Sequence, residues 1–214
     1  MSTHELSSIH IPERTSLSAV RTSRPRTRLL RPTAVRTTLT IEGQRYRVDA
    51  PRKRTYARLA KKGTVIPTVT DVADALVRLS SATRENIRRI VVVPRKKTSG
   101  AYVSQLLGKT VVVYGPLATR LAGYLLHESG HLVAFQSLGR FALGRRWRAW
   151  RKAMKQDGQA ITPYARTNVH EDFAESWLAY HGIPYVRPAL PNRFRVMDEI
   201  DAKMTQGSAP KVSP

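Results

Sequence analysis

No cysteine occurs among the 214 residues, which excludes disulfide bonds and thiolate metal ligands. Any metal site must therefore use His, Asp or Glu, and the chain has only six histidines. No apolar run reaches the about 18 residues of a membrane-spanning helix, and the amino-terminal segment lacks the apolar stretch of a secretory signal. These absences predict a soluble protein without membrane insertion, either cytoplasmic or the product of a phage or mobile element.

Acidic residues are also scarce, because 15 Asp and Glu stand against 37 Lys and Arg and give a net charge of +22. So basic a chain attracts polyanions such as nucleic acid. Residues 1–33 are rich in Ser, Thr, Arg and Pro and contain few large apolar side chains. This composition predicts a disordered basic arm, which could bind nucleic acid or another polyanion.

The rest of the chain has the hydrophobic pattern of one domain over residues 34–204, followed by a flexible tail at 205–214. Residues 34–62 predict a basic hairpin that turns at Glu42-Gly43 and a helix, and 63–204 predict the catalytic core described below. The core pattern predicts helices at 68–82, 116–138, 144–158, 168–182 and 192–204, strands at 88–94 and 109–115, a short strand at 101–103, and a loop at 159–167.

The segment LLHESGHLVAF, residues 125–135, carries two histidines four positions apart. Residues at that spacing share one helix face, so His127 and His131 can bind one metal ion while Glu128 holds a water molecule. Gly130 costs a helix about 1 kcal/mol relative to Ala, which is easier to understand if another element packs closely against it. The alternative is a buried helix that carries two histidines by coincidence.

A catalytic zinc ion usually takes three protein ligands, so a third ligand is needed. The metzincin pattern fails, because Ala134 and Ser137 stand where it requires Gly and His. The later segment NVHEDFAES offers Glu171 and Glu175, one helical turn apart. We interpret Glu171 as the zinc ligand and Glu175 as the acid that orients a ligating histidine. The alternative is a solvated acidic face of a helix.

Two other groups of residues need an interpretation. His170 is expected to be structural or exposed, and His181 stands at a helix end, where a cation suits the helix dipole. Residues 145–155 interleave Trp147 and Trp150 with arginines and lysines. We favour a solvated basic face with both tryptophans in the core. The alternatives are nucleic-acid binding by base stacking and selection of acidic substrate residues.

The segments HESGH and ITPYARTNVHEDFAESWLAY together resemble the catalytic domain of anthrax lethal factor and the clostridial Pro-Pro endopeptidases. In that family a tyrosine precedes the zinc-binding glutamate by seven residues, and a second acid follows four residues later. Tyr164, Glu171 and Glu175 stand at those spacings. The resemblance covers roughly residues 88–182 and does not extend to residues 1–62.

This resemblance implies a zincin-like α+β metallopeptidase, in which a small mixed sheet precedes the active-site helix and a helical carboxy-terminal part. It implies one zinc ion per chain, held by His127, His131 and Glu171. Glu128 would be the general base and Tyr164 the donor to the oxyanion, and the strand at 109–115 would be the edge strand that pairs with a peptide or protein substrate. The alternative function is a nucleic-acid-binding or virion-associated protein with an inactive zincin scaffold.

Overall fold

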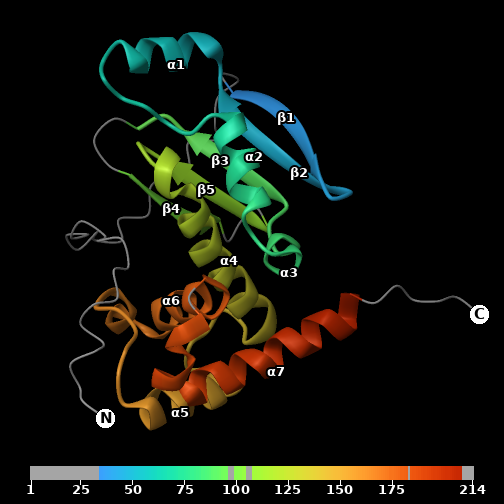
Figure 1. The fold of residues 1–214 in the computed structure, drawn as a ribbon, viewed down its shortest axis with the longest axis vertical. Helices are drawn as coiled ribbons and strands as arrows, with labels where there is room; N and C mark the ends of the chain where they lie inside the picture. The colour runs from blue at the N-terminus through green and yellow to red at the C-terminus, as the bar shows by residue number, and fades with distance from the viewer. Residues whose placement is uncertain (1–33, 96–98, 105–107, 183, 209–214) are drawn as a thin grey trace, which may run out of the picture. The chain divides into compact units, whose positions relative to one another are not determined.

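The computed structural model of the chain describes residues 34–95, 99–104, 108–182 and 184–208. The arm predicted at residues 1–33 and the last part of the predicted tail, 209–214, lie outside the described residues. The described residues combine one five-stranded sheet with helices, which confirms the α+β class (Figure 1). Within them, no helix has both the length and the apolar character needed to cross a lipid bilayer.

The sheet has two antiparallel strands at its edges and three parallel strands inside. Its strands are β1 (Ala34–Ile41), β2 (Gln44–Pro51), β3 (Arg89–Val93), β4 (Gly100–Ser104) and β5 (Thr110–Tyr114). Their order across the sheet is β1-β2-β3-β5-β4. The hairpin predicted at the start of the domain is confirmed, and both of its turn residues have positive φ, 48° at Glu42 and 77° at Gly43. Two positive φ angles give a tight turn that matches the twist of the paired strands.

One strand prediction is wrong, because the segment at 109–115 is not an edge strand. It contains β5, which lies between β3 and β4. β4 pairs antiparallel with β5 along its whole length, from Gly100 opposite Tyr114 to Ser104 opposite Thr110. The continuous run of valines in β5 is buried, as expected of an interior strand covered on both faces. The edge of the described sheet that neighbours β5 is therefore β4.

The helices follow the predicted order with three corrections. They are α1 (Lys53–Ala60), α2 (Val69–Val77), α3 (Ser81–Arg84), α4 (Leu121–Ser137), α5 (Arg148–Asp157), α6 (Val169–Gly182) and α7 (Pro191–Ser208), with short 3-10 helices η2 (Ala118–Arg120), η3 (Arg145–Trp147), η4 (Tyr164–Thr167) and η5 (Pro184–Ala189). The helix predicted at 68–82 is divided in two, because Ser80 caps a new helix, α3. The loop predicted at 159–167 contains η4, and α7 extends into the predicted tail as far as Ser208.

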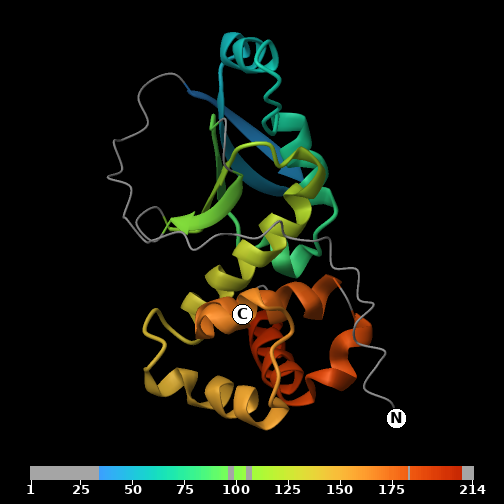
Figure 2. The same cartoon turned by 90° about the vertical axis from the view of Figure 1, so that its left-hand side faces the viewer.

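Two hydrophobic clusters form the core, and α4 belongs to both. The first cluster joins one face of the sheet to α2 and to one part of α4, including Leu125 and Leu132. The second joins Val133 and Ala134 of α4 to the aromatic side chains of α5 and α6 and to α7. Figure 2 shows α4 running from the sheet into the helical part. The residues of the HExxH pattern therefore lie where the two clusters meet.

Candidate metal centre

Close contact between α4 and α6 brings the predicted site residues together. A Cβ atom at Gly130 would lie 2.9 Å from Cβ of Trp177 and 3.0 Å from Cα of Ala174. Glycine thus permits an approach that any larger residue would prevent. The Oγ atom of Ser129 accepts a hydrogen bond of 3.1 Å from Nε1 of Trp177 and donates one of 2.6 Å to the carbonyl of Leu126. The two helices are therefore fixed against each other beside the histidines.

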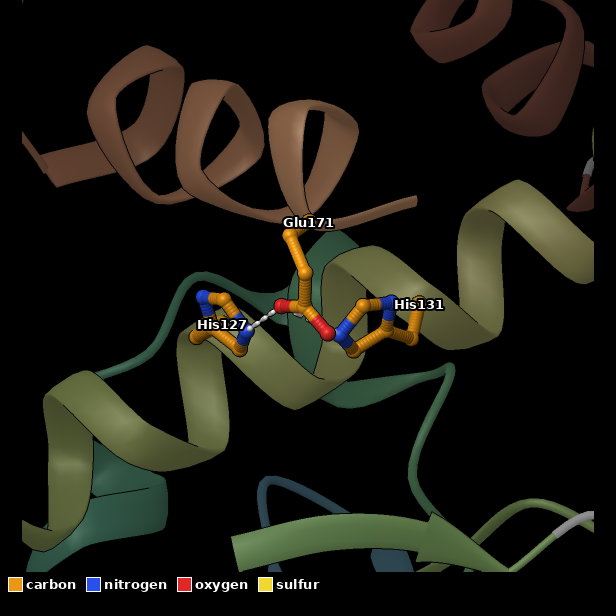
Figure 3. Close-up of side chains that lie close together, drawn as sticks. All are labelled: His127, His131 and Glu171. Atoms are coloured by element: carbon orange, nitrogen blue, oxygen red, sulfur yellow. Dashed lines mark hydrogen bonds and ion pairs between the residues drawn. The ribbon is translucent and has the colours of Figure 1, made fainter. Parts of the chain in front are cut away.

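Glu171 of α6 points between the two imidazoles of α4 (Figure 3). Its Oε2 atom is 3.2 Å from Nε2 of His127 and 3.3 Å from Nε2 of His131. One donor atom from each of the three residues lies within 4.8 Å of the others. A tetrahedral zinc ion with bonds of about 2.0–2.1 Å separates its ligand atoms by about 3.3 Å. Two imidazoles and one carboxylate at these distances fit such an ion.

The position of Glu171 depends on a cap that the sequence interpretation missed. Oδ1 of Asn168 accepts hydrogen bonds from the backbone N–H groups of His170, at 2.9 Å, and Glu171, at 3.1 Å. These bonds satisfy amide groups that the first turn of α6 cannot pair internally. Asn directly before a helix is a common N-cap, so the sequence did contain this signal.

A second carboxylate orients the imidazole of His127. Its Nδ1 atom is 2.7 Å from Oε1 of Glu175, and both side chains are almost fully buried. The other oxygen of Glu175 accepts a hydrogen bond of 2.9 Å from the hydroxyl of Thr162, which accepts one of 3.0 Å from the backbone N–H of Ala165. A proton held on Nδ1 leaves Nε2 available to a metal ion. Nothing in the sequence pattern identified Thr162.

The charges of the cluster are strongly coupled. Burial disfavours the His127 cation, but the hydrogen bonds with Glu171 and Glu175 outweigh it and raise the pKa of His127 to about 9. Burial alone would raise the pKa of Glu171, whereas its contacts with His127 and His131 hold that pKa well below its usual range. The carboxylates therefore favour positive charge between them, which either a proton or a divalent cation can supply.

The remaining predicted site residues lie around His127. Glu128 is buried, with 4% of its surface exposed. Burial raises the pKa of Tyr114, Arg95 lowers it, and the charge of Glu128 raises it further, so Glu128 lies near the end of β5. Tyr164 belongs to η4, and its ring centroid is 5.9 Å from that of His127. Three elements, α4, α6 and η4, thus contribute the predicted residues to one region.

Interpretations of the other histidines and of the tryptophans had mixed outcomes. His170, expected to be structural or exposed, is half-buried against Trp147, with ring centroids 4.7 Å apart, and this packing favours the structural interpretation. Burial lowers the pKa of His181, although Asp201 acts in the opposite direction, so its surroundings do not favour the cation that would suit the helix dipole. Trp147 and Trp150 are fully buried, which confirms their place in the core and excludes base stacking by them.

A buried ion pair, also missed from the sequence, holds α6 against α7. Arg193 donates to Asp172 through Nε at 2.9 Å and Nη2 at 2.8 Å, and through Nη1 to Asp157 at 3.0 Å. All three side chains are at most 2% exposed. This network connects the element that carries Glu171 to both neighbouring helices.

Comparison of the chain with protein-family models and with curated proteins finds no match. The features that bear on function are the donor set, the buried carboxylates and the resemblance of the two segments. These observations have a common centre, which is the pair of imidazoles on α4.

Proposed function

We propose that this chain is a zinc-dependent endopeptidase with a zincin-like fold. The observation that carries the proposal is the convergence of three donor atoms from two helices, with Oε2 of Glu171 at 3.2 and 3.3 Å from the Nε2 atoms of His127 and His131. The resemblance to lethal factor and the Pro-Pro endopeptidases supports the same three ligands.

One zinc ion per chain would be held by His127, His131 and Glu171. When bound, zinc supplies Lewis acidity, which makes a water molecule more acidic and polarises a carbonyl group. Glu175 keeps His127 in the tautomer whose Nε2 faces the ion and increases its basicity. Thr162 holds Glu175 and also the backbone of Ala165, so it links this support to the segment that carries the catalytic tyrosine.

Glu128 and Tyr164 perform the proton transfers and stabilise charge. Glu128 accepts the proton of the attacking water and delivers it to the leaving amine, a role that contributes about 10²–10⁴-fold to the rate. Its burial beside His127 shields the transfer from bulk water. The hydroxyl of Tyr164 donates to the oxyanion of the tetrahedral intermediate, which is worth about 2.7–4 kcal/mol in comparable sites.

The substrate in this proposal is an extended peptide that adds to the sheet beside α4. β4 is one of the two edge strands of the described sheet, and it contacts α4. An edge strand offers unpaired backbone groups that hold a peptide through main-chain hydrogen bonds. The scissile bond would then lie over the zinc ligands.

The test combines metal content with hydrolysis by the full chain. Zinc per chain is measured by elemental analysis, and cleavage is followed in a peptide library. The Glu128→Gln variant is expected to keep one zinc ion while its rate falls by about 10²–10⁴-fold. Glu199→Gln, at an exposed position on α7, is the matched control and should keep full activity. Zinc binding without cleavage of any peptide contradicts the proposal and favours the inactive scaffold.

A further inference from the structure

Two large apolar side chains protrude from the connection between α4 and α5. Phe141 is 84% exposed and Leu143 is 89% exposed, more than the other exposed large apolar side chains of the described residues. Single exposed apolar residues are ordinary on protein surfaces. Phe141 and Leu143, two positions apart, form a local apolar patch, and exposed apolar patches can mark interaction sites.

The backbone of this connection is held in place rather than free. Nε1 of Trp147 donates a hydrogen bond of 2.8 Å to the carbonyl of Gly139, and the N–H of Gly144 donates one of 2.8 Å to the carbonyl of Phe141. Arg151 also donates to the carbonyl of Gly144, at 3.4 Å. A turn fixed by hydrogen bonds thus holds these apolar side chains in solvent. Contact with water is unfavourable for them, and burial would remove it.

Exposed cations flank these two side chains in the sequence. Residues 138–156 contain seven Lys and Arg and no acidic residue. Those exposed around the turn and along the outer face of α5 are Arg140, Arg145, Arg146, Arg148, Lys152 and Lys155. The inner face of α5 buries Trp150 and Ala153, so its cations cannot turn inward. Figures 1 and 2 both show α5 on the side of the helical part that faces away from the sheet.

We propose that this apolar–basic patch, formed by Phe141, Leu143 and the six exposed cations, docks on an anionic lipid surface. The two apolar side chains would enter the boundary between headgroups and acyl chains, and the cations would contact lipid phosphates. Nucleic acid explains the patch less well, because it offers the aliphatic Leu143 no apolar phase and the nearby tryptophans are buried. The inference is independent of the zinc site and concerns where the protein acts.

The first test measures binding of the full chain to vesicles of mixed phosphatidylcholine and phosphatidylserine by co-sedimentation. Substitution of both apolar residues, Phe141→Ser with Leu143→Ser, is expected to weaken partitioning at least about tenfold, since each apolar side chain then loses its transfer from water. The matched control, Val65→Ser with Val77→Ser, alters residues that are 63% and 60% exposed elsewhere and should bind unchanged. Equal binding by both double variants overturns the proposal.

The second test detects whether the patch itself contacts the lipid. It thereby distinguishes docking through the patch from electrostatic attraction of vesicles to other basic parts of the chain. Because the chain has no cysteine, Leu143→Cys creates a unique site for a polarity-sensitive fluorophore. Vesicles should shift its emission to the blue, whereas the same label at Val65→Cys should not respond. Binding without a shift at position 143 overturns the proposal. The proposal is also overturned if the variant that lacks both apolar side chains loses more duplex DNA binding than vesicle binding.

Discussion

The consecutive helices α4 and α5 use their polar side chains in opposite ways. α4 buries His127, Glu128 and His131 near its centre, whereas α5 buries Trp150 and exposes most of its cations to water. The difference comes from the partners available, because α6 supplies carboxylates to the imidazoles of α4. A buried polar group without a partner would cost several kcal/mol. Burial together with a partner, rather than residue type, therefore separates the candidate metal centre from an ordinary charged surface.

From this contrast we expect the largest change in stability when the buried arginine of α7, Arg193, is substituted. Arg193→Ala should lower the free energy of unfolding by about 3–5 kcal/mol, because it leaves Asp172 and Asp157 buried without their cation. Arg148→Ala, on the outer face of α5, should change it by less than about 0.5 kcal/mol. Urea denaturation followed by circular dichroism measures both values. Similar losses in the two variants would show that burial does not distinguish these arginines.

The next effect concerns the close approach of α4 and α6. Gly130→Ala places a methyl group against Trp177 and the backbone of Ala174, and overpacking of this kind lowers stability by about 1–3 kcal/mol. Zinc affinity should fall in the same variant, since Glu171 moves away from the histidines. Gly123→Ala is the matched control in the same helix, where nothing lies within 4 Å, and it should stabilise the protein by about 0.5–1 kcal/mol. Thermal unfolding and zinc titration together test this prediction.

A smaller effect is expected from the acid that supports His127. Glu175→Gln keeps the shape of the side chain but removes its charge, and it should weaken zinc binding by about 10–100-fold. Competition with a chelating dye gives the dissociation constant, and Glu199→Gln again serves as the exposed control. An unchanged dissociation constant would mean that the contact between Glu175 and His127 does not tune the metal ligand.

The pH dependence of stability is expected to give the most gradual change. In the metal-free protein the pKa of His127 is raised to about 9, from about 6.5 in the unfolded chain. The free energy of folding contributed by protonated His127 and its carboxylate partners is therefore fully present below about pH 6.5. It is lost as the pH rises through about 9. Burial lowers the pKa values of His170 and His181, so they change charge below this window.

Melting temperatures in the presence of a chelator should thus fall between about pH 6.5 and pH 9. With zinc they should fall less, because the ion replaces the proton on His127 and binds more tightly as protons become scarce. His127→Gln should flatten the profile of the metal-free protein. A melting temperature that rises with pH in the chelated protein would contradict the charge assignment.

Much of the candidate site was predictable because its pieces are local. The four-residue spacing of His127 and His131 places them on one face of any helix, and the same holds for Glu171 and Glu175. Strand position was not predictable in this way. The valine run of β5 suits an interior strand as well as an edge strand, and only pairing with β4, which precedes it in the chain, decides between them.

The sequence by itself determined most of the secondary elements, the turn at Glu42-Gly43 and the side chains that share a helix face, because these depend on neighbours a few residues apart. Tertiary structure alone decided that Glu171 lies between two imidazoles 40 or more positions away, that Thr162 holds Glu175, and that burial lowers the pKa of His181. Each of these depends on which surfaces pack together and exclude water. The spacing of neighbouring residues in the sequence does not predict which side chains lose water or how far apart remote residues lie.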